Sequence, residues 1–587
     1  MDIHTKKNII FTLYLLYNLG LVCVLFIFRY AFIVVSIFLF ASHIRDIFCV
    51  IYHLIHIGRI TEKKKPLKNN FRTTICAFVP VYAEKVELVL NNIKSLCSQD
   101  LPENSKVFIF IICDGLVVGK ENKKPLFEEL DNLVKYDDET IYEEKYICWK
   151  TLEENTLYYK IGTIYGKAII LSHKAKNSGK KDSLIVGEQL IDKVNKMEDF
   201  KTKYNLTNPE YIYHTDSDTI SHKTCLRNIL ETFVESEDID GVSGMVRAYY
   251  NNDTKKSYLL KGYEKVFYIM QDFQYFFSLV LRRMVESELG TTTCLPGCVN
   301  MIKINEKSRK AIEEYKDLPE KDTNFLQAVT RMQGTDRRYT TLLLKQGAKL
   351  KMNWRAVVYT EPPLGVKAFI NQRRRWSSNA FFNSFIQLIL PEVPIYIRIS
   401  TLIDIGRLFS TIFRMVSYIW FWFFLGQVEI GVYIVLFCFV AIPYLYVLLW
   451  ALFLLEDKKE IRNIWVGFLY NKIIMPFLSV MTVSKMFFTA SNFAWGGFVA
   501  KKEEKEEEKE EMKVEIYEID GDIEVIELDI ENPEIVELEI ESEESVEEPE
   551  IFESEDVVKI QVIESENETE EYKYNENYNE AIEIMVR

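Results

Sequence analysis

The chain has 587 residues, enough for two or three domains, and 48% of them are hydrophobic. Its net charge of −15 hides two unlike parts: residues 501–587 carry 35 acidic and 8 basic side chains (net −27), and residues 1–500 carry 51 acidic and 63 basic ones (net +12). This division excludes a uniformly acidic soluble protein, and the apolar content excludes a wholly disordered chain. We therefore expect a basic, apolar body followed by an acidic tail.

Apolar runs at the start of the chain predict N-terminal membrane segments within residues 1–58. Residues 9–28 are free of charge and as long as a bilayer-spanning helix needs to be. The run is too long for a secretory signal peptide and lacks its small-residue cleavage site, so we interpret it as a retained anchor. Residues 31–57 are interrupted by Arg45 and Asp46, and form either a tilted span or a helix at the membrane interface.

Residues 70–380 are predicted to form the main domain, of the α/β class. Short β-rich runs over residues 73–78, 106–113 and 211–214 each end in a polar loop, and charged helical stretches lie between some of them. Alternating strands and helices are typical of a mostly parallel sheet, in which ligands bind at the carboxyl ends of the strands. Asp114 and Asp216 are expected at that edge.

Residues 381–500 return to membrane character. Residues 430–455 are free of charge and form the clearest span, and the basic residues after it place the next loop on the cytoplasmic side. A shorter run over residues 415–428, and residues 473–500 as one span or a span plus a re-entrant piece, bring the expected number of spans to about five. Amphipathic helices over residues 381–390 and 396–405 are expected at the cytosolic interface.

The cysteines and the tail carry weaker signals. The ten cysteines contain no CxxC pair, which favours a reduced, cytosol-facing context over a zinc site. Residues 501–587 alternate acids with Ile and Val after a Glu/Lys block, a pattern typical of a solvated, disordered tail; a partner-binding or irregular β segment is the alternative.

Asp216-Ser217-Asp218 is the first motif with chemical meaning, because two carboxylates at this spacing can hold a divalent cation against a diphosphate. It directly follows a strand-like run. The same spacing at Asp238/Asp240 and at Asp520/Asp522 does not, so those acids are expected to be solvated.

Three further segments are candidates for the functional site. Residues 176–183 (KNSGKKDS) bring glycine and lysines together for a phosphate, although a surface turn is the alternative, and their spacing excludes a Walker-type nucleotide hydrolase. Residues 372–376 (QRRRW) are either a lipid-headgroup and topology signal or a set that offers arginine to a diphosphate and an indole to a sugar. The last is residues 295–298 (LPGC).

The order and the amino-acid sequences of these segments resemble those of the chitin synthases, within the processive family-2 glycosyltransferases that include cellulose and hyaluronan synthases. The resemblance runs from about residue 70 to 500, and the segment CLPGC favours chitin over related polymers. It rests on residues 80–84 (PVYAE), 114–115 (DG), 179–183 (GKKDS), 215–219 (TDSDT), 271–275 (QDFQY), 286–298, 334–340 (GTDRRYT), 372–376 (QRRRW) and 494–496 (AWG).

The resemblance implies a transferase domain of GT-A type and a role for each matching residue. Asp336 would be the general base, Asp218 would coordinate Mg²⁺ (or Mn²⁺) on the donor diphosphate, and Arg375 would neutralise the departing UDP. The remaining implied substrate-binding residues are Tyr82, Glu84 and Asp114 for the uridine, Lys180, Asp182 and Asp216 for the donor, Gln372 and Trp376 for the acceptor, and Cys298 without a more particular role.

The implied activity is polymerisation of N-acetylglucosamine from UDP-N-acetylglucosamine into β-1,4-linked chitin, with extrusion of the chain across the membrane. The implied partners are the donor, the growing chitin chain and membrane lipids, with no nucleic acid, and a homodimer is compatible with the resemblance. The protein would be a multi-pass protein of the plasma membrane with its transferase domain in the cytosol. The alternatives are a related β-glycan synthase, of hyaluronan or cellulose type, and a non-catalytic scaffold descended from a synthase.

Two positions depart from the family pattern. Thr335 stands where the family usually has Glu before the catalytic Asp, and Ala494 and Gly497 flank Trp495-Gly496 where the usual motif is Ser-Trp-Gly-Thr. The first changes the electrostatic setting of the base and the second puts details of the channel entrance in doubt. Neither removes a group that the mechanism requires.

Overall fold

The computed structural model describes residues 3–27, 31–61, 66–68, 70–119, 122–138, 140–248, 262–318, 324–423 and 430–490, together with five short strands within residues 518–575. The chain divides into two units, Met1–Phe493 and Ala494–Arg587.

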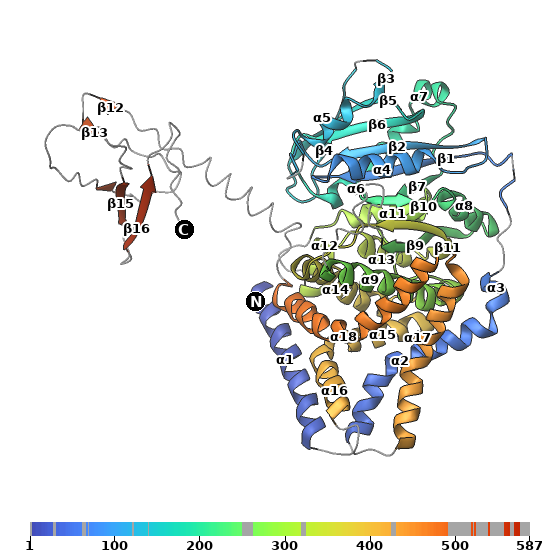
Figure 1. Cartoon of the computed structure of the whole chain (residues 1–587). Helices are drawn as coiled ribbons and strands as arrows, with labels where there is room; N and C mark the ends of the chain where they lie inside the picture. The colour runs from blue at the N-terminus through green and yellow to red at the C-terminus, as the bar shows by residue number, and fades with distance from the viewer. Residues whose placement is uncertain are drawn as a thin grey trace. The chain divides into compact units, whose positions relative to one another are not determined.

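A mixed sheet of eleven strands, with a parallel centre, lies in the middle of the first unit (Figure 1). Its order is β3-β5-β6-β2-β1-β7-β10-β9-β11-β8, with β4 paired to β5. Strands β6, β2, β1 and β7 run parallel, whereas β10 is antiparallel to both of its neighbours. The strands are β1 Thr73–Val81, β2 Ser105–Cys113, β3 Lys135–Tyr136, β4 Tyr142–Ile147, β5 Glu154–Ile164, β6 Lys167–Lys174, β7 Tyr211–His214, β8 Thr219–Ser221, β9 Ile239–Ala248, β10 Asn300–Lys303 and β11 Lys349–Thr360.

Helices cover both faces of this sheet. Every residue of β1 is buried, and its alternate side chains enter two different clusters: Ile75 lies in the cluster that includes Val89 of α4 (Val86–Cys97), and Phe78 lies in the one that includes Val186 of α6 (Lys180–Val194). A continuous apolar run is typical of a parallel strand that is covered on both sides. The α/β class and the three predicted strands are therefore confirmed.

The other helices of this domain lie mainly on the side of the later strands (Figure 1). Helix α9, the π-helical turn η1 and α10 follow one another without a break. The bounds are α5 Leu126–Asp131, α7 Glu198–Lys203, α8 Cys225–Glu235, α9 Gly262–Phe277, η1 Ser278–Arg283, α10 Met284–Glu288, α11 Glu306–Tyr315, α12 Phe325–Met332, α13 Asp336–Lys345, α14 Val366–Ile389 and α15 Ile395–Phe409.

Helices α1 (Ile3–Ile27), α2 (Ala31–Ile55), α16 (Thr411–Phe423) and α17 (Ile430–Leu454) extend from one side of the sheet domain (Figure 1), and the short α3 (Ile57–Thr61) follows α2. In the described part of the chain, three helices are long and apolar enough to cross a membrane, over Thr5–Ile27, Phe437–Leu454 and Lys458–Phe488. The count of about five spans stays a prediction, because residues 415–428 lie partly outside the described residues.

Helix α18 (Lys458–Phe488) meets the length and composition of a span but packs along the sheet domain. Its Phe468 ring lies 5.8 Å from that of Phe273 on α9, and Lys485 Nζ donates to Asn371 Oδ1 on α14 at 2.7 Å. Figure 1 draws it between the sheet domain and the helices α1 and α16. Residues 491–500, the end of the run predicted to enter the membrane, lie outside the described residues.

The charged pair that interrupts the second apolar run ties α2 to the rest of the first unit. Arg282 of η1 donates from Nε and Nη2 to the Asp46 carboxylate at 2.9 and 3.0 Å. Arg45 donates from Nη1 to Asp404 of α15 at 2.8 Å. Removing one partner of a buried ion pair costs about 3–5 kcal/mol. These pairs explain why an otherwise apolar helix carries two charges.

The described part of the second unit consists of strands alone. Strand β12 (Glu518–Ile519) pairs with β13 (Asp522–Ile523), and β15 (Val557–Ile563) pairs with β14 (Leu538–Glu539) and β16 (Thr569–Asn575). The rest of the predicted acidic tail, and the motif Ala494-Trp495-Gly496, lie outside the described residues.

Candidate active site

A fully buried lysine organises the loop of residues 176–179. Lys174, the last residue of β6, has its Nζ 2.6 Å from Asp114 Oδ1 and 3.1 Å from Asp182 Oδ2. The same Nζ donates to the Ser178 hydroxyl at 2.8 Å. The sequence analysis missed Lys174. Its position at the end of an apolar strand, directly before a basic loop, is the signal that points to it.

Asp114 and Asp182 bind this loop instead of facing open space. Asp114 accepts from the backbone N–H of Ser178 (3.0 Å) and of Gly179 (2.8 Å). Asp182 accepts from the Tyr146 hydroxyl at 2.8 Å, and it is completely buried. Asp114 was predicted to bind the uridine and Asp182 to belong to the donor site, and the structure shows both of them holding the loop of residues 176–179.

Lys180 follows the loop and points to the first carboxylate of the Asp-Ser-Asp motif. Gly179 has a φ of +89°, a conformation that glycine adopts without steric cost, and α6 begins at the next residue. Lys180 forms an ion pair with Asp216. Burial opposes its charge, but Asp216, with Asp336 and Asp218, outweighs burial and raises the pKa of Lys180.

Asp216 and Asp218 follow β7 directly, as predicted. Asn92 of α4 fixes this turn by donating to the carbonyl oxygens of Asp216 (3.1 Å) and Thr219 (2.6 Å). Burial, and then repulsion from Asp216 and Glu84, raises the pKa of Asp218 to about 7. Carboxylates that repel one another in this way favour the approach of a cation.

In the second Asp-x-Asp spacing, Asp238/Asp240, the prediction that both acids are solvated is wrong for one of them. Asp240 is not solvated: only 5% of it is exposed, and it accepts from Asn305 Nδ2 at 2.7 Å and pairs with Lys307 at 2.8 Å. It is buried because it lies within β9, an inner strand of the sheet. Asp238 is half exposed and pairs with Lys349. Asp520 lies outside the described residues.

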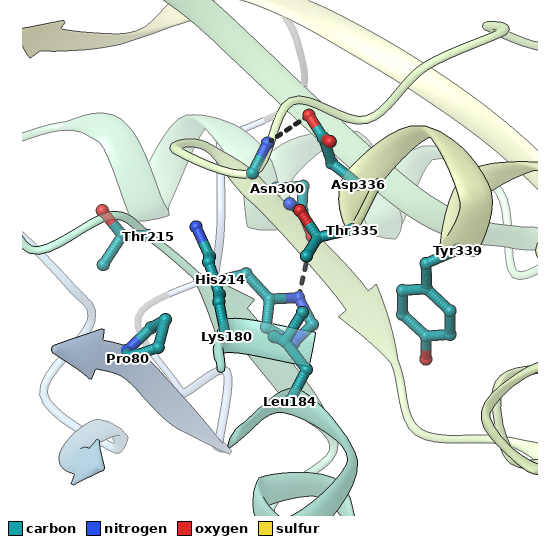
Figure 2. A pocket seen from close by; sticks show the side chains of 10 residues that line it. Pro80, Lys180, Leu184, His214, Thr215, Asn300, Thr335, Asp336 and Tyr339 are labelled. Carbon is teal, nitrogen blue, oxygen red and sulfur yellow. Dashed lines mark hydrogen bonds between the residues drawn. The ribbon is translucent and has the colours of Figure 1, made fainter. Parts of the chain in front are cut away.

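The predicted base, Asp336, is the first residue of α13 and faces the turn of residues 296–298. The backbone N–H of Gly297 donates to Asp336 Oδ2 at 3.3 Å, the hydrogen bond dashed beside Asp336 in Figure 2. A Cβ on Gly297 would lie 3.7 Å from Asp336 Cβ, 3.8 Å from Lys180 Nζ and 3.9 Å from Asp216 Oδ1. The predicted base and the Lys180–Asp216 pair therefore lie close together around Gly297.

Glycine is also required just before the base. Gly334 has a φ of +82°, and a Cβ there would lie 2.1 Å from Asn379 Oδ1 on α14. Only glycine permits this approach, so the loop that carries Asp336 is fitted closely against α14. Thr335, the residue that departs from the family pattern, caps α13 without a side-chain hydrogen bond of its own.

Helix α14 carries the QRRRW motif toward the same region. Burial lowers the pKa of the Arg375 guanidinium and the nearby Asp216 opposes this shift. The Trp376 ring is 45% exposed and lies 6.1 Å from the Tyr275 ring, with the Arg373 guanidinium 4.5 Å above it. Gln372, by contrast, has a buried amide oxygen without a hydrogen-bond partner in the described part of the chain.

Tyr82 and Glu84 follow the carboxyl end of β1, and the Tyr82 N–H donates to Glu84 Oε2 at 2.7 Å.

Cys298 lies near three acids of the site, Asp216, Asp218 and Asp336. Burial, with Asp216, Asp218 and Asp336 adding to it, raises the pKa of the Cys298 thiol well above its usual range. Such a protonated thiol is a poor nucleophile, so the geometry does not favour covalent catalysis by cysteine.

Two acids of the long family block prove to be anchors. Asp272 of α9 accepts two hydrogen bonds from Arg247 of β9, at 2.8 and 2.9 Å, and Glu286 of α10 accepts from the N–H and the hydroxyl of Thr293 at 3.1 Å. They hold the segments on either side of the site and do not enter it.

A small pocket of about 20 Å³ lies beside Asp336. This is room for about one water molecule and not for a sugar. Figure 2 shows its lining, which includes Lys180, His214, Gly297, Asn300, Asp336 and Tyr339.

Comparison with family models matches the chain to the chitin synthase model over residues 47–203 and 160–524. The chain therefore belongs to the chitin synthase family.

Individual relatives are distant and mostly longer. Chitin synthase 4 of Cryptococcus neoformans is 27% identical over 378 residues, covering 57% of this chain and 28% of the relative. Chitin synthase 8 of Gibberella zeae is 23% identical over 450 residues, covering 71% of this chain and 65% of the relative. The chain thus spans less than two thirds of the length of these relatives.

Among solved structures, the mannosyltransferase PcManGT from Pyrobaculum calidifontis, in complex with GDP-Man and Mn²⁺, matches 74% of this chain and 99% of its own. The identity is 11% and the TM-score is 0.37, too low to support an argument about the site.

Proposed function

We propose that this protein is a membrane-embedded, processive, inverting glycosyltransferase that polymerises N-acetylglucosamine from UDP-N-acetylglucosamine into β-1,4-linked chitin. The observation that carries the proposal is the meeting of Asp336, Lys180 and Asp216 around Gly297, in a chain of this family. It brings a carboxylate suited to accept a proton within reach of groups suited to a diphosphate.

The donor occupies the side of Lys180 and the Asp-Ser-Asp motif. The uridine lies near Tyr82 and Glu84, beyond the end of β1. Asp114 and Asp182 serve the donor through the loop of residues 176–179, which they hold. Lys180 turns from Asp216 toward the diphosphate when the donor binds, since both are anions within its range.

A divalent cation, Mg²⁺ or Mn²⁺, would be held by Asp218, with Asp216 beside it, and would supply positive charge to the diphosphate as UDP leaves. The residues fit such an ion, because the pKa of Asp218 is raised by burial and by neighbouring acids, a repulsion that a cation relieves. In the described part of the chain, no group of three or more His, Cys, Asp or Glu is arranged to hold a metal alone. This suits an ion that depends on substrate oxygens for the rest of its shell.

The acceptor is the end of the growing chain. Asp336 takes the proton of its 4-hydroxyl group, the oxygen attacks the anomeric carbon of the donor, and the bond from that carbon to the UDP oxygen breaks. Because attack comes from the face opposite UDP, the new linkage is β. The Gly297 N–H donates a hydrogen bond to Asp336 Oδ2, so Asp336 Oδ1 is available to accept the proton.

Arg375 and Lys180 neutralise the charge that develops on UDP, which is preorganised electrostatic stabilisation. Trp376 and Gln372 position the acceptor: the half-exposed indole offers a face to a sugar ring, and the unpartnered Gln372 oxygen accepts a hydroxyl hydrogen bond. An unmade buried hydrogen bond costs about 1–3 kcal/mol, which a bound sugar would recover.

Three helices that are long and apolar enough to cross a membrane support polymer synthesis at a bilayer. We propose a plasma-membrane location with the transferase domain in the cytosol and extrusion of the chain between the helices. The basic body, with its net charge of +12 over residues 1–500, suits both an anionic donor and an anionic inner leaflet.

The test is incorporation of radiolabelled N-acetylglucosamine from its UDP donor, with Mg²⁺ or Mn²⁺, by purified full-length protein into chitinase-sensitive polymer. Asp336→Asn is expected to lower the rate about 100- to 10,000-fold while UDP binding by calorimetry is retained. No polymer from the wild type would refute the activity, full activity of Asp336→Asn would refute the base, and a panel of other UDP-sugars would reveal a different polymer.

A further inference from the structure

Behind Asp336 lie four polar side chains that the mechanism above does not use, and we call them the Asn300 frame. They are His214 at the end of β7, Asn300 at the start of β10, Glu188 on α6 and Tyr339 on α13. His214 and Asn300 face each other across the antiparallel β7–β10 pair. Figure 2 shows His214, Asn300 and Tyr339 around the small pocket beside Asp336.

Asn300 connects the turn of residues 296–298 to β7. Its Nδ2 donates to the Pro296 carbonyl oxygen at 2.8 Å, and its Oδ1 lies 2.9 Å from His214 Nδ1. Because the amide nitrogen serves the carbonyl, the amide oxygen accepts, so the proton of the imidazole lies on Nδ1. Burial lowers the pKa of His214 to about 4, and the imidazole is therefore neutral near pH 7.

The other side of the imidazole meets α13. The His214 and Tyr339 rings pack edge to face, with centroids 6.3 Å apart and planes at 81°. The Tyr339 hydroxyl donates to Glu188 Oε1 at 3.1 Å, and that oxygen lies 3.8 Å from His214 Nε2, beyond hydrogen-bonding distance. Tyr339 is one helical turn after Asp336, so the frame touches both the helix that bears the base and the turn that binds it.

These contacts form a closed path. The base accepts from Gly297, whose neighbour Pro296 is held by Asn300; Asn300 is held by His214, which packs on Tyr339 of the same helix as the base. Only 5% of His214 and 4% of Asn300 are exposed, so a sugar does not reach them. A buried polar network with its hydrogen bonds made fixes orientation more sharply than apolar packing does.

We infer that His214 and Asn300, supported by Tyr339 and Glu188, are positioning residues that hold the turn of residues 296–298 against α13 and thereby aim the Asp336 carboxylate at the acceptor hydroxyl. The inference rests on the proposed function, in which Asp336 is the base. The frame acts through Gly297 and Asp336, and it leaves the donor groups where they are.

The experiment compares His214→Phe, which keeps a ring against Tyr339 but loses the Nδ1 donor, with His214→Asn, whose amide offers a donor at the same place. We expect His214→Phe to lower kcat about tenfold, with the KM for UDP-N-acetylglucosamine unchanged, because small displacements of a catalytic group cost this much or more. His214→Asn should recover most of the rate. The melting temperature and UDP affinity of each full-length variant are measured alongside.

The discriminating measurement is the double variant His214→Phe/Asp336→Asn. If His214 acts only through the base, the double variant keeps the residual rate of Asp336→Asn, since the two losses are then not additive. A further loss in the double variant, a raised KM with an unchanged kcat, or no recovery in His214→Asn would overturn the inference.

The failure of the two proposals can be told apart. If Asp336→Asn is disabled and His214→Phe works like the wild type, the frame is not a positioning device and the proposed function stands. If Asp336→Asn is fully active, Asp336 is not the base, and the Asn300 frame then has no base to position. Should His214→Phe not fold, Asn300→Leu, which removes the hydrogen bonds to both His214 and the Pro296 carbonyl, carries the same comparison.

Discussion

Two loops flank the groups that lie around Gly297, and they are held by opposite kinds of chemistry. The loop of residues 176–179, on the donor side, is fixed by Lys174 between two buried carboxylates. The turn of residues 296–298, on the acceptor side, is fixed by neutral groups, the amide of Asn300 and the imidazole of His214. In the described part of the chain, Asp336 itself forms no ion pair.

The difference follows from what each loop has to present. In the proposed mechanism the donor side offers cations to a diphosphate, and a loop locked by internal charge pairs fixes the start of α6, where Lys180 pairs with Asp216. The acceptor side must leave a carboxylate able to take a proton, and a fixed cation next to it would weaken it as a base. Ion pairs therefore fix the loop on the side proposed to bind the charged diphosphate. Neutral hydrogen bonds fix the turn on the side proposed to transfer the proton.

The largest effect is expected from Lys174→Met. It leaves Asp114 and Asp182 without their shared cation, which should lower the free energy of unfolding by about 3–5 kcal/mol and abolish tight UDP binding. Thermal unfolding and calorimetry in detergent measure both. Adding Asp182→Asn should recover part of the stability. Lys176→Met, at a side chain that is 72% exposed, is the control and should change little.

A smaller and more selective effect is expected from Gly297→Ala. The added methyl group makes ordinary contacts at 3.7–3.9 Å, so the protein should fold, but the methyl group fills the point where the two sides meet. We expect polymer synthesis to fall at least about tenfold with an almost unchanged melting temperature. Gly406→Ala, which adds a methyl group with nothing within 4 Å, is the matched control. Unchanged kinetics in Gly297→Ala would contradict the assembled site.

The acceptor side should also show a pH signature in stability. Burial raises the pKa of Glu188 from 4.5 to about 7, with Tyr339 partly opposing it. The stability contributed by the protonated form is complete below pH 4.5 and is lost as the pH rises through 7. Glu188→Gln, which does not titrate, should therefore gain about 3 kcal/mol of stability on the wild type as the pH rises from 4.5 to 7. Melting curves with parallel pH profiles would show the prediction to be wrong.

The smallest effect is expected from Asp238→Asn. Asp238 has the spacing of a metal-binding pair with Asp240, but it is half exposed and its neighbour is occupied by Lys307. Polymer synthesis and its metal dependence should not change measurably, whereas Asp218→Asn should remove both. A loss of metal activation in Asp238→Asn would mean that the wrong acid pair was assigned.

The sequence predicts one side of this comparison better than the other. Strand β7 and the two acids after it are readable because an apolar run ending in polar residues marks the edge of a parallel sheet. The burial of Lys174 is not, since a lysine in a basic loop looks solvated until both acids that hold it are in place. The contact of His214 with Asn300 joins residues 86 apart through an antiparallel pairing whose register no local pattern specifies.

The membrane helices show the same limit. Hydrophobic length predicts α1 and α17 well, because a spanning helix is a local property of the sequence. It cannot tell that Arg45 and Asp46 interrupt α2 in order to meet Arg282 and Asp404, residues far away in the chain. Nor can it tell that α18, which is long and apolar enough to cross a membrane, also contacts α9 through Phe468 and Gly467.

Gly467 lies where α18 crosses α9 most closely: a Cβ there would come within 2.4 Å of the Ile269 carbonyl oxygen. The helix that follows α17 is thus pressed backbone to backbone against the domain that bears the active site. We therefore expect α18 and the domain that carries the candidate site to move as one body.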